Sequence, residues 1–270
     1  MKKVTFDSNW PESYKVSYNY DLLEIYNEVP KKFLGYTYHY LLRYDATLDL
    51  IKKYAKQGGS ILDVAAAQGN FSLALAELGY DVTWNDLRSE LVDYVKLKYE
   101  KGKINFAPGN VFELGFKDKF DVVLVTEIIE HVAHPDDFLS KIAEMIKPGG
   151  FIVMTTPNGA YFLNDLPKFS DHPDPSIFES VQFKPNSDGH IFLLYREELY
   201  TFAKKTNLNL LETKFYSNFI SSGHLKSSLL LPFIPKALLN LFEKIVQKSP
   251  LFIKKKISTG IAAVFQKTNY

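Results

Sequence analysis

Short apolar runs alternate with amphipathic stretches through the middle of the chain. Five runs have the length of a buried strand and are bounded by turn residues: 61–64, 81–85, 104–107, 120–126 and 151–156. Three stretches between them carry apolar residues at helical spacing: 70–78, 91–99 and 135–147. Glycine, or a Pro-Gly-Gly run, ends each of these helices. The alternation predicts parallel strands joined by right-handed crossovers, and so an α/β fold with a Rossmann-like, doubly wound sheet.

The flanking segments extend this core at both ends. Residues 1–57 are rich in tyrosine and predict an N-terminal aromatic cap with a helix in its second half. The tyrosines there either pack with their hydroxyls at a surface or form a lid over a ligand.

Beyond the fifth strand, the pattern predicts a core that extends to residue 216 and closes with a separate last strand. We expect a lid loop at 159–188, whose aromatic residues indicate packing and which would shape the acceptor pocket. A helix over 195–205 and a sixth strand over 208–215 follow. A basic helical insertion, 217–258, then precedes a final strand within 259–270, which would pair with the sixth. The sheet would thus have about seven strands, the last of them antiparallel.

Composition narrows the class of protein. The 270 residues include no cysteine, which excludes disulfides, thiolate catalysis and cysteine-ligated zinc. Charge is nearly balanced, with 32 basic and 31 acidic side chains, so nothing points to a nucleic-acid partner. The N-terminus lacks the apolar run of a signal peptide, and no segment has about eighteen consecutive apolar residues. We therefore expect an intracellular, cytoplasmic protein.

Positive charge is concentrated near the C-terminus. Residues 226–270 contain eight lysines and one acid, Glu243. Leucine, isoleucine and phenylalanine are interspersed with the lysines over 226–258. This pattern fits a basic amphipathic element that makes peripheral contact with an anionic membrane surface or a lipid-linked acceptor. A helical cap on the core, or a dimer contact, explains it as well, and the oligomeric state is left open.

Polar residues follow the predicted strands where a doubly wound sheet binds its ligands. The first strand ends in Asp63 and a turn of small residues, 65–69, which lets a ligand approach the backbone and the helix start behind it. Asp86, at the end of the second strand, is spaced to accept both hydroxyls of a ribose. A helix N-cap before Leu87 is the alternative role for Asp86.

These segments, ILDVAAAQGNFSLALAELGYDVTWNDL, FDVVLVTEIIEHVAHPDDFL and IKPGGFIVMTTPN, together resemble the class I S-adenosylmethionine-dependent methyltransferases. The resemblance covers about 58–158 and is weaker around 189–215. It implies S-adenosylmethionine as cofactor, with these contacts: Asp63, Ala65 and Gly69 at the methionine part, Asp86 at the ribose, Asn110 and Val111 at the adenine, and Thr126 in the same site. Alanines stand at 65 and 67 where the family usually has glycine. Because alanine does not readily adopt positive φ, we expect the backbone to differ there.

A second set of residues concerns the acceptor. Glu127, Glu130 and His131 are spaced i, i+3 and i+4, so they share one face if the turn is helical. With His190 they form a ligand set suited to Mg²⁺, Mn²⁺ or Zn²⁺ and are the candidate catalytic residues. The set resembles that of the metal-dependent O-methyltransferases of ubiquinone biosynthesis and of small-RNA 3′ ends. Without a metal, His131 or Glu127 would act as an ordinary general base.

The sequence thus predicts methyl transfer from S-adenosylmethionine to an oxygen, or less readily a nitrogen, of a small molecule. A sugar, a glycan precursor or another polar metabolite is the first acceptor considered. Methylation of a quinone-type lipid at a membrane surface is the alternative within enzymes, and a non-catalytic binding module is the alternative outside them. An RNA acceptor is suggested only by the metal set, because the chain lacks a basic, aromatic-rich platform for nucleic acid.

Overall fold

The computed structural model describes residues 1–26, 28–182 and 189–268. Its strands are β1 (Ser60–Val64), β2 (Asp81–Trp84), β3 (Lys103–Phe106), β4 (Phe120–Thr126), β5 (Ile146–Pro157), β6 (Leu208–Asn218) and β7 (Ser258–Lys267). Its α-helices are α1 (Glu12–Glu24), α2 (Leu34–Tyr54), α3 (Asn70–Glu77), α4 (Leu91–Lys98), α5 (Pro135–Met145), α6 (Arg196–Lys205), α7 (Lys236–Lys248) and α8 (Leu251–Ile257).

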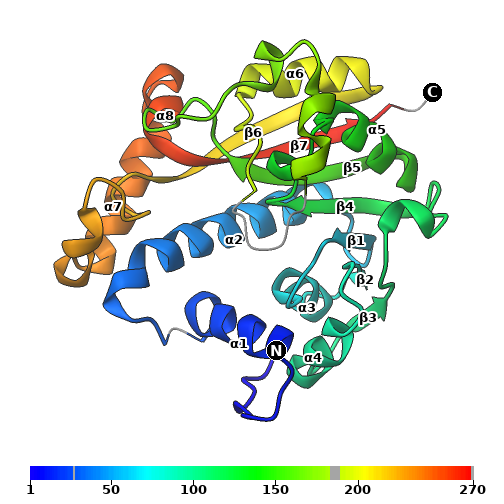
Figure 1. The fold of residues 1–270 in the computed structure, drawn as a ribbon, viewed down its shortest axis with the longest axis horizontal. Coiled ribbons are helices and arrows are strands. Elements are labelled where there is room, and N and C mark those ends of the chain that lie inside the picture. Colours follow the sequence, from blue (N-terminus) through cyan, green and yellow to red (C-terminus); the bar gives the residue numbers. More distant parts are fainter. Residues whose placement is uncertain (27, 183–188, 269–270) are drawn as a thin grey trace.

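The strands form one seven-stranded sheet in the order β3-β2-β1-β4-β5-β7-β6 (Figure 1). β1 to β5 are parallel, and β7 is antiparallel to both of its neighbours, β5 and β6. The order in which the chain lays down its strands reverses between β1 and β4: β2 and β3 follow on one side of β1, and β4 and β5 lie on its other side. The carboxyl ends of β1 and β4 therefore frame the crevice in which such sheets bind ligands. The predicted fold class, including the antiparallel last strand, is confirmed.

Both faces of the sheet are buried, which explains why its strands read as continuous apolar runs. Successive residues of β4 illustrate this: Val123 and Val125 belong to the core under α5 and α6, whereas Val122 and Leu124 belong to the core under α2 and α3. Figure 1 shows α5 and α6 on one side of the sheet and α2 and α3 on the other. The crevice between β1 and β4 is therefore framed by strands that are packed on both faces.

Most predicted boundaries agree with the structure to within one or two residues, but the start of β5 and the end of β6 differ by more. β6 ends at Asn218, three residues beyond the predicted end at 215. The helix predicted over 135–147 ends at Met145, and β5 begins at Ile146, five residues earlier than predicted. Ile146 already pairs with Phe120 of β4, so the Pro-Gly-Gly run lies inside the strand after a shift in register. The glycines therefore mark an irregularity in the pairing of β4 with β5.

The two flanking segments are helical, as predicted. α1 and α2 lie in the N-terminal part, and α7 and α8 lie between β6 and β7. In the lid loop, Phe169 and Phe178 pack edge-to-face on Phe192, which confirms a packed arrangement for these two residues. Its segment 183–188, with the aromatic residue expected at 183, lies outside the described residues. No helix in the described part of the chain is long and apolar enough to cross a membrane.

Candidate active site

The turn between β1 and α3 is built from backbone in the left-handed region. Ala65, Ala67 and Gly69 have φ of 51°, 46° and 73°. The Ala67 amide donates to Asp86 Oδ2 over 2.9 Å, and the Trp84 indole donates to the Ala67 carbonyl over 3.0 Å. A Cβ on Gly69 would lie 2.9 Å from the Val95 methyl groups, so only glycine fits there without a shift.

The expectation that alanine would keep this turn out of positive φ is wrong. Hydrogen bonds with Trp84 and Asp86 hold Ala67 in the conformation that glycine adopts without cost, and Ala65 adopts the same conformation. A left-handed alanine costs about 1–2 kcal/mol, and strain of this kind is typical of ligand-binding loops. The turn is therefore small and strained.

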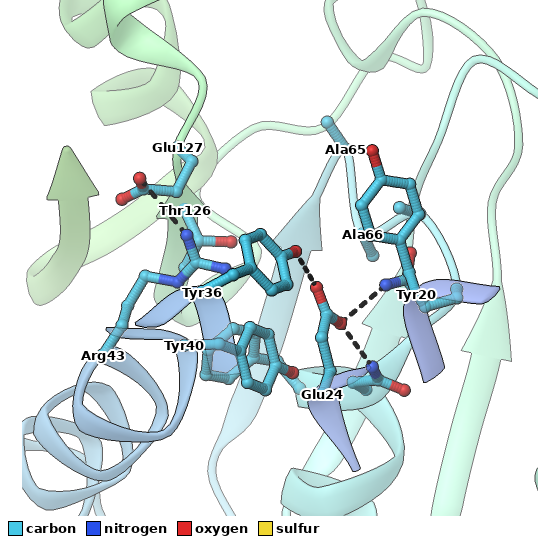
Figure 2. A pocket seen from close by; sticks show the side chains of 13 residues that line it. Tyr20, Glu24, Tyr36, Tyr40, Arg43, Ala65, Ala66, Thr126 and Glu127 are labelled. Atoms are coloured by element: carbon cyan, nitrogen blue, oxygen red, sulfur yellow. Dashed lines mark hydrogen bonds and ion pairs between the residues drawn. The ribbon is translucent and has the colours of Figure 1, made fainter. Parts of the chain in front are cut away.

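A cavity opens above this turn, and the N-terminal helices form its far wall. Its lining consists of Tyr20, Glu24, Tyr36, Tyr40, Arg43, Ala65, Ala66, Ala67, Gln68, Asn70, Phe71, Thr126 and Glu127. Figure 2 shows the side chains from α1 and α2 pointing toward the alanine turn and the end of β4. Thr126 and Ala65 thus face the cavity, whereas Gly69 is not part of its lining; the cofactor contacts of all three stay predictions.

Sequence analysis did not identify the contributions of α1 and α2 to this cavity. The clearest is Glu24, whose carboxylate accepts hydrogen bonds from Tyr36 at 2.6 Å, Gln68 at 2.7 Å and Asn70 at 2.9 Å. Burial raises the pKa of Glu24. An acid at the end of a polar helix gives no periodic signal, so only the tyrosine-rich composition pointed to this segment.

Arg43 crosses the cavity to Glu127. Its Nη1 lies 3.2 Å from Glu127 Oε2, while Glu127 Oε1 accepts hydrogen bonds from Thr155 at 2.9 Å and Tyr216 at 3.2 Å. The Arg43 Nε is buried without a hydrogen-bond partner. Burial opposes ionisation of Glu127, but the Arg43 guanidinium and His39 outweigh it, so the pKa of Glu127 is lowered. The surroundings of Glu127 therefore favour its ionised form in this wall.

The two aspartates at the ends of β1 and β2 hold the turn in place. Asp63 Oδ2 accepts a hydrogen bond of 2.5 Å from Ser72, and its Oδ1 is buried without a partner. Burial raises the pKa of Asp63 to about 7. Asp86 accepts from the backbone amide of Arg88 at 3.0 Å and from its guanidinium at 2.9 Å. Since α4 begins only at Leu91, the contact to the Arg88 amide is a turn and not a helix cap.

Asn110 and Val111 lie after β3, apart from this cavity lining. The Asn110 side chain accepts from the Phe112 amide, and Val111 is buried in the core. Their contact with adenine, and that of Asp86 with the ribose, remain predictions.

Three of the four predicted metal ligands converge beyond the end of β4. Glu130 and His131 belong to a 3₁₀ helix, Ile129–His131, and His190 comes from the segment before α6. The ligand atoms of Glu130, His131 and His190 all lie within 4.8 Å of one another. Glu127 is not part of this cluster, because its φ of 53° puts it outside the helical turn and its carboxylate pairs with Arg43.

Glu130 is the centre of this cluster. Its Oε2 accepts a hydrogen bond of 3.0 Å from Thr156. Its Oε1 is buried without a hydrogen-bond partner, 4.0 Å from His131 Nε2 and 3.9 Å from His190 Nε2. Metal bonds of about 2.1 Å separate neighbouring ligand atoms by about 3–4 Å, and Glu130 Oε1 lies at about this distance from each of the two nitrogens.

The pKa values of the two glutamates of the turn are shifted in opposite directions. Burial, and then the negative charge of Glu127, raise the pKa of Glu130 well above its usual value. Environments that push the pKa values of two neighbouring acids apart are typical of catalytic sites. A cation shared with His131 and His190 would replace the proton on Glu130.

Comparison with known proteins agrees with this geometry. The methyltransferase domain family matches residues 36–213, more than half of the chain. The ubiquinone biosynthesis O-methyltransferase of Shewanella halifaxensis is 33% identical over 105 residues, which are 37% of this chain and 44% of that enzyme. The chain thus spans less than half the length of this curated relative.

Solved structures show the same fold at low identity. A methyltransferase from Archaeoglobus fulgidus aligns with a TM-score of 0.54 and 14% identity, over 92% of this chain and 99% of that one. The [4+2]-cyclase SpnF aligns with a TM-score of 0.53 and 14% identity, over 83% and 80%. Because the second is named for a different reaction, the fold by itself does not define the activity. The family match and the site motifs together show that this chain belongs to the methyltransferase domain family, within the class I S-adenosylmethionine-dependent methyltransferases.

Proposed function

We propose that the protein transfers a methyl group from S-adenosylmethionine to a hydroxyl oxygen of a small molecule, assisted by a divalent cation on Glu130, His131 and His190. The observation that carries this proposal is the buried, unpartnered Glu130 Oε1 between two imidazole nitrogens. Buried polar atoms are nearly always hydrogen-bonded. An unpartnered carboxylate oxygen that faces two histidines is therefore best explained by a ligand.

The cavity suits the amino-acid end of the cofactor. Arg43 has an unpartnered, buried Nε and would bind the carboxylate of the methionine part. Glu24, held by Tyr36, Gln68 and Asn70, would accept from its ammonium group. The strained turn at Ala65 to Ala67 would let the sulfonium approach the backbone closely.

Methyl transfer from a sulfonium breaks a carbon–sulfur bond and forms a carbon–oxygen bond, while the acceptor hydroxyl loses its proton. Positioning of the nucleophile in line with the methyl group supplies much of the rate. A divalent cation, when bound, lowers the pKa of the hydroxyl and fixes its orientation. Thr156 orients Glu130 for this role, and the hydroxyl proton leaves to a solvent water.

Two acceptor classes remain candidates. A polar metabolite or a glycan precursor is the first, with oxygen preferred over nitrogen because the ligand set is suited to binding a hydroxyl. A quinone-type phenol is the second, and it is favoured by the similarity to ubiquinone biosynthesis O-methyltransferases over 105 residues. Isothermal titration with S-adenosylmethionine tests the remaining alternative, a non-catalytic module, because no binding would favour that alternative.

The cation is tested by methyl transfer from radiolabelled S-adenosylmethionine to a panel of phenols and sugars. We expect chelation to remove most of the activity and Mg²⁺, Mn²⁺ or Zn²⁺ to restore it. Titration of the chelated protein with S-adenosylmethionine is the control, because the cofactor cavity should not depend on the cation. Full activity after rigorous chelation would eliminate the cation and leave His131 or Glu127 as a general base.

A further inference from the structure

The most exposed apolar side chains of the described residues are concentrated in the insertion between β6 and β7. Ten large hydrophobic residues are more than half exposed, and eight of them lie in this insertion: Leu225, Leu229, Leu230, Phe233, Leu238, Leu241, Ile245 and Phe252. We call these eight the insertion surface. Contiguous apolar exposure of this kind marks an interaction site in most folded proteins.

Helix α7 contributes one complete apolar stripe to this surface. Leu239, Glu243 and Val246 are buried on its inner side, whereas Leu238, Leu241 and Ile245 point outward and are 53–57% exposed. The turn before the helix carries Phe233, which is 79% exposed. Figure 1 shows α7 and α8 at one end of the molecule, away from α5 and the β3 edge. The outer side of α7 is therefore open to a ligand as large as a membrane surface.

The charges around the insertion surface have one sign. Seven lysines lie between residues 226 and 257, and the one acid in this range, Glu243, is buried and bonded to Asn218 and Gln247. Among the described residues, Lys255 pairs with Glu197, whereas five exposed lysines take part in none of the ion pairs: Lys226, Lys236, Lys244, Lys248 and Lys256. Apolar side chains are thus surrounded by unpaired positive charge.

We propose that the insertion surface docks onto an anionic phospholipid bilayer. Exposed Phe and Leu side chains enter the interface between headgroups and acyl chains, and the lysines attract acidic headgroups. A second copy of the chain is a poorer occupant, because a self-contact of this surface would bring lysines against lysines. Contact is peripheral, since the described helices include no membrane-spanning one.

The insertion surface also adjoins the helix that lines the cofactor cavity. The short helix Lys31–Phe33, just before α2, contacts the turn Ser227–Leu229 of the insertion. Gly35 packs so closely on this region that a Cβ there would lie 2.5 Å from the Ser222 carbonyl oxygen. One residue further, Tyr36 lines the cavity and donates to Glu24. Membrane docking would thus bring the wall of the cavity next to the bilayer.

The docking is tested by co-sedimentation of the full chain with vesicles, which needs no methyl transfer and so can fail independently of the proposed function. We expect binding to vesicles that contain phosphatidylserine, weak binding to phosphatidylcholine alone, and release as salt is raised. The double variant Leu230→Ser/Phe233→Ser and the triple variant Lys236→Glu/Lys244→Glu/Lys248→Glu should each lower the partition coefficient at least tenfold.

Matched variants on other surfaces control for general effects. Leu211→Ser removes an exposed leucine of β6, and Lys101→Glu/Lys117→Glu/Lys141→Glu reverses three lysines elsewhere; both should bind like the parent protein. Circular dichroism verifies that all variants fold. Absence of binding to acidic vesicles at low salt would overturn the proposal. So would a concentration-dependent dimer, lost in Leu230→Ser/Phe233→Ser, because it would identify the surface as a contact between copies.

Discussion

Two regions meet at the end of β4, and their glutamates differ in how completely the carboxylate oxygens are paired. In the cofactor cavity, both oxygens of Glu127 are bonded, and the partners come from α2, β5 and β6. In the adjacent cluster, Glu130 bonds through one oxygen only, and the other faces two histidines. Three residues apart in the sequence, one acid is held ionised and the other favours its protonated form.

The contrast distinguishes a carboxylate with a structural role from one that can take part in the reaction. A carboxylate whose bonds are all made by the protein stabilises the wall that it belongs to. A buried carboxylate oxygen that lacks a hydrogen-bond partner is a candidate binding site for a ligand. Under the proposed function, Glu130 belongs to the reaction and Glu127 to the wall of the cavity.

The largest effect is expected at Glu130. Glu130→Gln keeps the shape but removes the negative charge, so kcat/KM for methyl transfer should fall by about 10²–10³-fold. Affinity for S-adenosylmethionine, measured by titration calorimetry, should stay within about threefold of the parent protein's. Full turnover by this variant would show that Glu130 takes no part in the reaction, and the proposed difference between Glu127 and Glu130 would be wrong.

Arg43→Met changes the cofactor cavity and should lower the free energy of unfolding of the protein. It leaves Glu127 as a buried, unpaired charge, which typically costs about 3–5 kcal/mol. Urea unfolding measures the loss, and the double variant Arg43→Met/Glu127→Gln should recover a large part of it. If the single variant is as stable as the parent protein, Glu127 and Arg43 do not form the structural pair described above.

Asp63, whose Oδ1 is also buried without a hydrogen-bond partner, predicts a pH effect. Burial raises its folded-state pKa from 3.8 to about 7, so the native state holds a proton that the unfolded chain has already lost in this window. Its contribution to the free energy of unfolding is therefore largest below pH 4 and declines as pH rises toward 7, by about 2 kcal/mol or more. Denaturant unfolding at several pH values should show this slope, and Asp63→Asn should flatten it.

The smallest effect is expected at the strained turn. Ala67→Gly relieves a left-handed alanine but increases the entropy of the unfolded chain, so the net gain should be at most about 1 kcal/mol. Ala74→Gly, in the right-handed backbone of α3, is the matched control and should destabilise by about 1 kcal/mol. Equal losses from both variants would show that the turn at Ala67 is not strained.

The fold was predictable because burial on both faces of the sheet leaves a continuous apolar signal along each strand. The cluster of Glu130 and His131 was predictable because the residues are neighbours in sequence. The separation of Glu127 from this cluster was not predictable. Its own left-handed backbone conformation redirects its side chain, and no periodic pattern in the sequence encodes that conformation. Glu24 was missed for a related reason: its role depends on α1 packing against the α3 start, a contact across 46 positions.

The position of β7 has a consequence for the order of folding. β7 lies between β5 and β6, so β6 has no strand partner until residues 258–267 have been synthesised. Tyr216, which bonds to Glu127 from β6, is fixed by the same late event, because its ring packs directly on Gly260. On the ribosome, the cavity wall would therefore be completed only after the whole insertion has emerged, and premature release before β7 would leave the β5 edge open to pairing with other chains.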